Sequence, residues 1–178
     1  MTTPYHPLAR GLHWLMALLI AGLLVLGHYM SELPLSPEKL QYFSWHKWTG
    51  VTVFALLWVR LAWRLVHRPP ALSDTLSPLQ QRLAHTGHGA LYLLMLAMPL
   101  SGWLMSSAKG FNTTFFGLFD LPNLIERDKA LAASLKSVHG TLANLLMVLV
   151  VAHIGAALKH QLIDKDNLMA RMRPARQK

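Results

Sequence analysis

Residues 135–163 have the sequence LKSVHGTLANLLMVLVVAHIGAALKHQLI, a long apolar segment. As a helix, this segment is long and apolar enough to cross about 30 Å of hydrocarbon. It carries His139 and His153, whose separation corresponds to about 21 Å and nearly four whole helical turns. Both imidazoles therefore leave the same side of one helix, one near each membrane face. Because ionisable groups in a membrane are costly and usually functional, this stripe indicates two metal centres stacked across a bilayer.

Three further segments, at about 11–30, 45–66 and 85–106, are also long and apolar enough to span a membrane. Proline and glycine in the polar connections between them mark turns. The chain has 178 residues, of which 53% are hydrophobic and only 14% charged, which is unlike an ordinary soluble domain. We therefore expect an all-α fold, an integral membrane four-helix bundle, in which residues 1–178 form a single domain with the fourth span at about 135–163.

The basic residues near the span ends predict the orientation of the bundle. The sequence has 17 lysine and arginine residues. Those expected on one side are Lys39, Lys47, Lys109, Arg127, Lys129 and Lys136, and the remaining 11 lie on the other side, which also holds both termini. The positive-inside rule places the richer side, and so both termini, in the cytoplasm. The basic tail 169–178 is then expected to bind the lipid surface.

Two compositional features limit the function. The formal net charge is +9, but the membrane topology accounts for it, so we expect no nucleic-acid partner. Cysteine is absent, which excludes disulfides, thiolate zinc sites, cysteine-ligated iron–sulfur clusters and covalent c-type haem. Any redox cofactor must therefore be held by other ligands, and ten histidines are available.

With this topology the histidines fall at two depths. The cytoplasmic half holds His13, His85, His88, His153 and His160. The external half holds His28, His46 and His139. Each half of the membrane thus has at least two histidines from different helices. We interpret His6, His28, His67 and His85 as interfacial polar residues, and His13, His46, His139 and His153 as metal ligands.

Haem explains this pattern better than other metal cofactors. A b-type haem takes two axial nitrogens on opposite faces of a flat apolar ring, and facing helices of a bundle can supply them. Small residues near the ligands, namely Gly50, Gly140, Gly155 and Ala156, would leave room for the macrocycle. Zinc prefers three or four converging ligands, and the core of the spans has no acidic residue. The same lack of acidic residues disfavours a proton-coupled transporter.

The chain resembles a known family in several segments. These are GLHWLMALL around His13, HKWTG at His46, LAHTGHGALYLL at 83–94, SLKSVHGTLANLL around His139 and AHIGAALKH around His153. They are similar to the bacterial cytochrome b561 family of small dihaem proteins of the inner membrane, and the resemblance covers nearly the whole chain. It implies a multi-pass inner-membrane protein with two haem b groups. It also implies that His13 and His153 bind the haem nearer the cytoplasm, and His46 and His139 the outer haem. Sorting the histidines by their depth in the membrane gives the same pairs, but it also allows His28 as a ligand of the outer haem.

Two stacked haems form an electron path across the membrane, and the resemblance implies a quinone, ubiquinone, at one end. The cytoplasmic cluster of His88, Lys159 and His160 is our predicted quinone site, because imidazole can bond a quinone carbonyl and deliver a proton. The alternative is that His88 and His160 only contact lipid headgroups or haem propionates. Arg60 and Arg64 are predicted propionate partners, and an ordinary basic anchor is the alternative.

At the outer face, Lys47 and Lys136 flank the ligands and are expected to steer a small anion to the haem edge. One activity known in the family is oxidation of superoxide with reduction of ubiquinone, and it is our first functional hypothesis. The second is a cytochrome b subunit that passes electrons from a periplasmic dehydrogenase or hydrogenase to quinone. The third is a haem-handling membrane protein without turnover. The aromatic loop with Phe111, Phe115, Phe116 and Phe119 is expected to form a helix on the membrane surface, or a docking patch.

Overall fold

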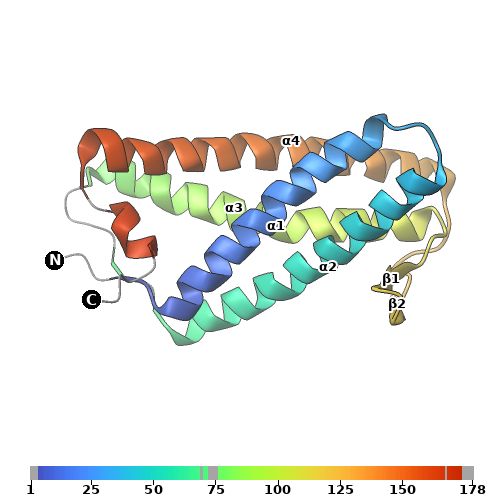
Figure 1. Cartoon of the computed structure of the whole chain (residues 1–178), viewed down its shortest axis with the longest axis horizontal. Helices are drawn as coiled ribbons and strands as arrows, with labels where there is room; N and C mark the ends of the chain where they lie inside the picture. Colours follow the sequence, from blue (N-terminus) through green and yellow to red (C-terminus); the bar gives the residue numbers. More distant parts are fainter. Residues whose placement is uncertain (1–3, 69, 72–75, 167, 174–178) are drawn as a thin grey trace.

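The computed structural model of the chain describes residues 4–68, 70–71, 76–166 and 168–173. Four long helices account for most of it, with a small hairpin in the connection between the third and the fourth (Figure 1). The elements are α1 (Pro7–Glu32), α2 (Pro37–Val66), α3 (Pro78–Ala108), β1 (Thr113–Phe115), β2 (Phe119–Leu121), α4 (Lys129–Lys159), the π-helical turn η1 (His160–Asp164) and the 3-10 helix η2 (Leu168–Met172). Each predicted span lies within one of these helices, and the fourth continues into η1.

The helices begin earlier than the hydrophobic spans because polar side chains cap them. The Ser36 side chain accepts from the backbone N–H of Lys39 at the start of α2. Ser77 forms a reciprocal capping box with Gln80 at the start of α3. The Asp128 carboxylate accepts from the first backbone N–H groups of α4. Such caps satisfy backbone donors that lack a partner within the helix, so each helix extends beyond the apolar segment.

Consecutive helices run in opposite directions, and α1 and α2 are inclined to α3 and α4 (Figure 1). The closest packing is within the α1–α2 and α3–α4 pairs. We call the end of the bundle that carries β1 and β2 the hairpin end. We call the opposite end, where α1 begins and α4 ends, the basal end. α4 therefore runs from the hairpin end, with His139, to the basal end, with His153.

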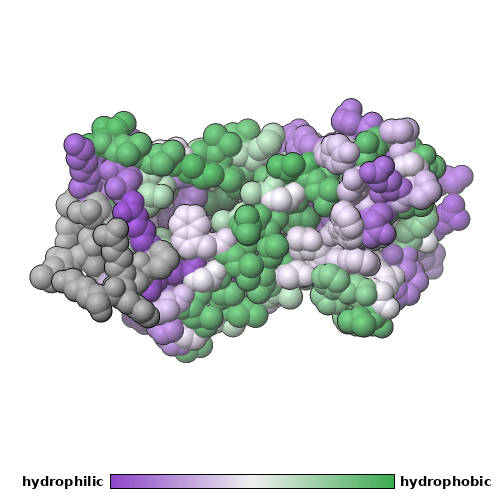
Figure 2. All heavy atoms as spheres, in the orientation of Figure 1, coloured by the Kyte–Doolittle hydropathy of each residue, from purple (hydrophilic) through white to green (hydrophobic). Residues whose placement is uncertain are grey.

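The outside of the bundle is apolar, as a membrane protein requires. All four helices are long and apolar enough to cross a membrane, and large aliphatic side chains such as Leu18, Val25 and Val148 point outward. Figure 2 shows hydrophobic residues over the middle of the molecule and hydrophilic residues gathered at the hairpin end. The predicted class, an integral membrane four-helix bundle, is confirmed.

A buried apolar cluster lies at mid-height, between the levels of the ligand histidines. The buried cluster is made by Met16, Ile20, Val53, Leu57 and Leu146 from three helices. Leu146 stands midway along α4 between His139 and His153. This buried core thus separates the two histidine levels.

The aromatic loop after α3 forms a hairpin, so the prediction of a surface helix was wrong. β1 and β2 pair antiparallel, with Phe115 opposite Phe119. The turn between them places Phe116 at φ 50° and Gly117 at φ 73°. Positive φ at both central residues is typical of a tight hairpin turn, and it prevents a helix from continuing. The Phe116 ring stacks on Trp48 with centroids 5.0 Å apart, which docks the hairpin on α2.

The end of the described chain packs on the basal end. We call residues 168–173 the strap. The Arg171 side chain is buried, at 7% exposure, whereas Arg173 is exposed, and the lipid-surface anchor expected of the basic tail stays a prediction. The rest of that tail, 174–178, lies outside the described residues. Hydrogen bonds tie the strap to earlier parts of the chain. The N–H groups of Tyr5 (backbone), Trp14 (Nε1) and Arg10 (Nη1) donate to the carbonyl oxygens of Arg171, Met172 and Arg173, respectively. Arg171 Nη2 donates to the Ala71 carbonyl.

Candidate functional site

Two pairs of imidazoles face each other inside the bundle, one near each end. At the basal end, His13 of α1 and His153 of α4 have ring centroids 6.2 Å apart and planes inclined by 68°. At the hairpin end, His46 of α2 and His139 of α4 have centroids 6.3 Å apart and planes inclined by 78°. α4 thus contributes one ring to each pair, as the fourteen-residue spacing predicted.

The separation within each pair fits a shared metal ion. A metal–imidazole bond is about 2 Å long, and the ring centroid lies about 1 Å behind the bonding nitrogen. Two imidazoles on opposite faces of one ion therefore have centroids about 6 Å apart, close to the 6.2 Å and 6.3 Å observed. Two opposed nitrogens with an apolar surrounding are the donor set that a b-type haem takes. Both pairs therefore fit the group.

Glycines adjoin the imidazoles at the hairpin end. A Cβ atom at Gly27 would lie 3.2 Å from Cε1 of His46, and one at Gly102 would lie 3.2 Å from Cε1 of His139. Both distances are too short for an ordinary contact, so any larger residue would push the ring away. The sequence analysis missed these two glycines, because they belong to helices other than those of the rings they touch.

The small residues that we did single out border open space. A Cβ atom at Gly50, Gly140 or Gly155 would meet nothing within 4 Å. Space of this kind beside a ligand suits a flat macrocycle, although it equally suits contact with lipid.

A guanidinium lies beside the basal pair. Arg60 Nε donates to the hydroxyl of Tyr92 at 2.9 Å, and its Nη2 is 3.4 Å from Nδ1 of His13. The Arg64 guanidinium lies over the same tyrosine ring, 5.6 Å from its centroid. The two arginines, one helical turn apart, therefore share one aromatic support. Arg60 is close to the ligand and Arg64 is exposed.

The three residues predicted to form a quinone site lie in two separate groups. The His88 ring is 5.6 Å from that of His153, so a third imidazole joins the basal pair. Lys159 instead bonds both oxygens of Asp164, at 2.8 Å and 2.5 Å. His160 Nδ1 is 2.6 Å from Asp166 and 3.2 Å from Asp164. The latter group holds three potential metal donors within 4.8 Å of one another, but the Lys159 ammonium already neutralises Asp164.

Lysines gather at the hairpin end, as predicted for Lys47 and Lys136. Lys109, which we had not singled out, interacts electrostatically with both of them. Partial burial and the Lys136 ammonium hold the pKa of Lys109 below its usual range. Lys109 and Lys136 line a surface hollow of about 360 Å³ together with Arg127 and Lys129. The hairpin end therefore has an electropositive surface.

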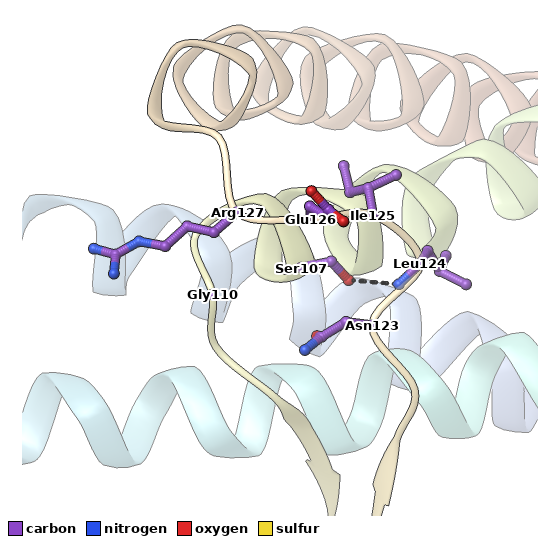
Figure 3. A pocket seen from close by; sticks show the side chains of 7 residues that line it. All are labelled: Ser107, Gly110, Asn123, Leu124, Ile125, Glu126 and Arg127. Atoms are coloured by element: carbon purple, nitrogen blue, oxygen red, sulfur yellow. Dashed lines mark hydrogen bonds between the residues drawn. The ribbon is translucent and has the colours of Figure 1, made fainter.

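A second hollow at the hairpin end lies between the end of α3 and the loop that leads to α4 (Figure 3). Ser107 closes it by accepting a hydrogen bond from the backbone N–H of Leu124 at 3.2 Å. Gly110, at φ 75°, allows the Arg127 side chain to pass close to the backbone. None of the histidines lines this hollow, and we assign it no function.

The histidines interpreted as interfacial have local partners. His6 caps α1 by accepting from the N–H of Leu8. His67 stacks on Trp63, with centroids 3.7 Å apart. His28 is exposed, and its Nδ1 is 2.9 Å from the Leu24 carbonyl of its own helix. Its ring thus bonds its own helix at the surface, which favours His46 as the outer partner of His139.

The comparison with known proteins agrees with this architecture. The profile of the family described as prokaryotic cytochrome b561 matches residues 4–175. The chain is 35% identical to cytochrome b561 homolog 2 of Escherichia coli (strain K12), over 94% of this chain and 90% of that protein. It is 32% identical to the probable superoxide oxidase CybB of Yersinia pestis, over 98% of each. It is 31% identical to cytochrome b561 homolog 1 of Escherichia coli (strain K12), over 93% of this chain and 94% of that protein.

These matches extend over nearly the full length of the chain and of its relatives, and the range of the family profile spans all four helices. The chain therefore belongs to the prokaryotic cytochrome b561 family, the multi-pass electron-transfer cytochromes of the bacterial inner membrane that bind haem b.

Proposed function

We propose that this cytochrome oxidises superoxide at the hairpin end and reduces ubiquinone at the basal end. Two superoxide anions each give up one electron and become dioxygen. Ubiquinone takes both electrons and two protons and becomes ubiquinol. The observation that carries the proposal is the stacking of two imidazole pairs along α4, with a lysine cluster at one end and a third imidazole at the other.

The whole chain, residues 1–178, acts in this proposal as one cytochrome b domain with two haem b groups. His13 and His153 hold the first group, and His46 and His139 hold the second. Each bound haem supplies a reversible one-electron iron couple. Arg60 and Arg64 pair with the propionates of the basal group, because a guanidinium makes charge-assisted bonds to carboxylates. Tyr92 holds the Arg60 side chain in place for this contact.

The hairpin end faces the periplasm and both termini face the cytoplasm. The support is the excess of lysine and arginine at the basal side of the spans. Lys47, Lys109 and Lys136 then meet solutes outside the inner membrane. Their combined field attracts small anions and raises their encounter rate with the His46–His139 site. The name of the relative from Yersinia pestis, a probable superoxide oxidase, supports superoxide as that anion.

His88 provides the quinone contact at the basal end. Its ring lies beside His153, and an imidazole can bond a quinone carbonyl and deliver a proton near neutral pH. Lys159 and His160 belong to the proton supply. Their contacts with Asp164 and Asp166 form a chain of ionisable groups from which protons can be passed on.

Purified, haem-loaded protein in liposomes that contain ubiquinone tests the proposal. We expect two haems per chain, rapid reduction of the haem spectrum by enzymatically generated superoxide, and ubiquinol formation at one molecule per two superoxide anions. Superoxide dismutase should abolish the reaction, and protein with His139→Ala is the matched control for non-enzymatic electron transfer.

Three results would contradict the proposal. Haem reduction by a copurifying periplasmic dehydrogenase or hydrogenase, with no response to superoxide, would indicate an electron-transfer subunit. Substoichiometric and exchangeable haem without turnover would indicate a haem-handling protein. A single haem per chain would contradict the assignment of two ligand pairs.

A further inference from the structure

Ser101 lies on α3 against one of the proposed ligands and has no role in the function described above. It is buried, at 6% exposure, in the turn that follows Pro99. Its Oγ is 2.8 Å from the carbonyl oxygen of Met98 and 2.8 Å from Nδ1 of His139. Ser101 and Gly102 together therefore contact the edge of the His139 ring.

These two contacts determine which nitrogen of His139 carries the proton. A carbonyl oxygen can only accept, so the single hydroxyl hydrogen of Ser101 is donated to Met98. The Ser101 oxygen must then accept from His139, and Nδ1 must carry a hydrogen. The other nitrogen, Nε2, is left with a free lone pair, which is the form that binds a metal.

The opposite ring of the pair has no such partner. In the part of the chain that the structure describes, Nδ1 of His46 is buried and has no hydrogen-bond partner. Gly27 packs on its ring but offers no side chain. The hairpin-end pair is therefore asymmetric: the protein orients one imidazole through a buried hydroxyl and leaves the other without this support.

We propose that Ser101 is a positioning residue that fixes the tautomer and orientation of His139 and lowers the reduction potential of the iron bound there. The proposal rests on the proposed role of His139 as a haem ligand. An acceptor on Nδ1–H makes the imidazole a more basic ligand, which favours the more oxidised metal. Ser101 thereby biases electrons away from the hairpin end and towards the basal end.

Redox titration of the haem-loaded protein tests this proposal. Ser101→Ala should raise the midpoint potential of one of the two haems and leave the other unchanged. If losing the hydrogen bond changes the one-electron redox equilibrium by about tenfold, the midpoint potential shifts by about 59 mV. Ser101→Thr keeps the hydroxyl and should restore the original potential. The ferric electron paramagnetic resonance signal of the same haem should change in Ser101→Ala and return in Ser101→Thr.

Thr52→Val is the matched control. Thr52 is a part-buried hydroxyl on α2 that bonds only the Trp48 carbonyl of its own helix among the described contacts, so both potentials should stay unchanged. If Ser101→Ala lowers the haem content, Ser101→Cys supplies the measurement, because a thiol is a weaker acceptor of similar shape. In Ser101→Cys, the midpoint potential of the affected haem should lie between its values in the unmodified protein and in Ser101→Ala.

The results separate this inference from the proposed function. If His139→Ala removes one haem but both potentials are the same in Ser101→Ala, Ser101→Cys and the unmodified protein, the positioning role is wrong and the ligand assignment stands. If His139→Ala keeps both haems, the ligand assignment itself fails, and the inference fails with it.

Discussion

At the basal end, His13 and His153 lie beside a guanidinium and a third imidazole, whereas at the hairpin end His46 and His139 are packed against glycines and a buried serine. The distance between the rings is nearly the same in both pairs. The ligand geometry alone therefore cannot tell the two sites apart. The difference lies in the neighbours: charged and proton-carrying groups at one end, and close packing with one neutral hydrogen bond at the other.

In the proposed function, this contrast corresponds to proton-coupled chemistry at the basal end and simple electron acceptance at the hairpin end. Quinone reduction consumes protons, which His88 and the acidic cluster around His160 can handle. Oxidation of superoxide releases no proton and needs only an attractive field, which the lysines provide. The following predictions test how independent the two ends are, beginning with the largest effect.

Removing a ligand should abolish one site and leave the other. We expect His153→Ala to lose the basal haem and His139→Ala the hairpin-end haem, because each haem would lose one of the two histidines proposed to hold it. The haem-to-protein ratio should fall from about two to about one in each case. Optical spectra and haem extraction give the measurement. Loss of both haems from either variant would mean that the two sites depend on each other.

Replacing His88 should impair the basal end without changing the hairpin end. We expect His88→Gln to keep both haems and to reduce ubiquinol formation by about 100-fold, the lower part of the range for general acid–base catalysis. Reduction of the haems by superoxide, measured in the absence of quinone, should be unchanged. His85→Gln is the matched control, since His85 is an exposed histidine one turn away on α3. Unchanged quinone turnover in His88→Gln would exclude His88 from the site.

Replacing Arg60 should weaken haem binding at the basal site only. We expect Arg60→Met to weaken haem binding there by about 10-fold to 100-fold, as is typical when a group that supports a metal site is lost. Arg64→Met should have a smaller effect, because Arg64 is exposed and contacts the Tyr92 face rather than His13. Haem transfer to an apo-globin measures both. Equal effects at the two arginines would indicate a general electrostatic anchor.

The smallest effect concerns the lysines. Lys47→Glu combined with Lys136→Glu should lower the rate constant for superoxide by about tenfold at low ionic strength, with a weaker salt dependence. Lys39→Glu is the matched control, since Lys39 lies at the same end but is held by the Leu33 carbonyl. Stopped-flow reduction of the haems gives the rate. An unchanged rate would remove the steering role while leaving both haem sites intact.

Much of this architecture could be predicted from the sequence because it depends on periodicity. The spacing of His139 and His153 determines that both face one side of α4, whatever the surrounding packing. The starting residues of the helices could also have been found, since Ser36, Ser77 and Asp128 are ordinary capping residues.

The neighbours of the ligands could not be predicted, because they depend on contacts between helices. Ser101 meets His139, and Arg60 meets His13, only after the bundle has formed. Two misses had a local signal. Asp164 stands four residues after His160, which is a helical pairing distance. Phe116 and Gly117 between short aromatic segments could have suggested a hairpin rather than a helix.

The strap has a consequence for biosynthesis. Its bond from Arg10 to the Arg173 carbonyl joins residues 163 positions apart. Because translation proceeds from the N-terminus, the residues that cover the start of α1 leave the ribosome after all four helices. The basal end therefore remains open while the four helices are being made, and the strap can cover it only after α4 has been synthesised.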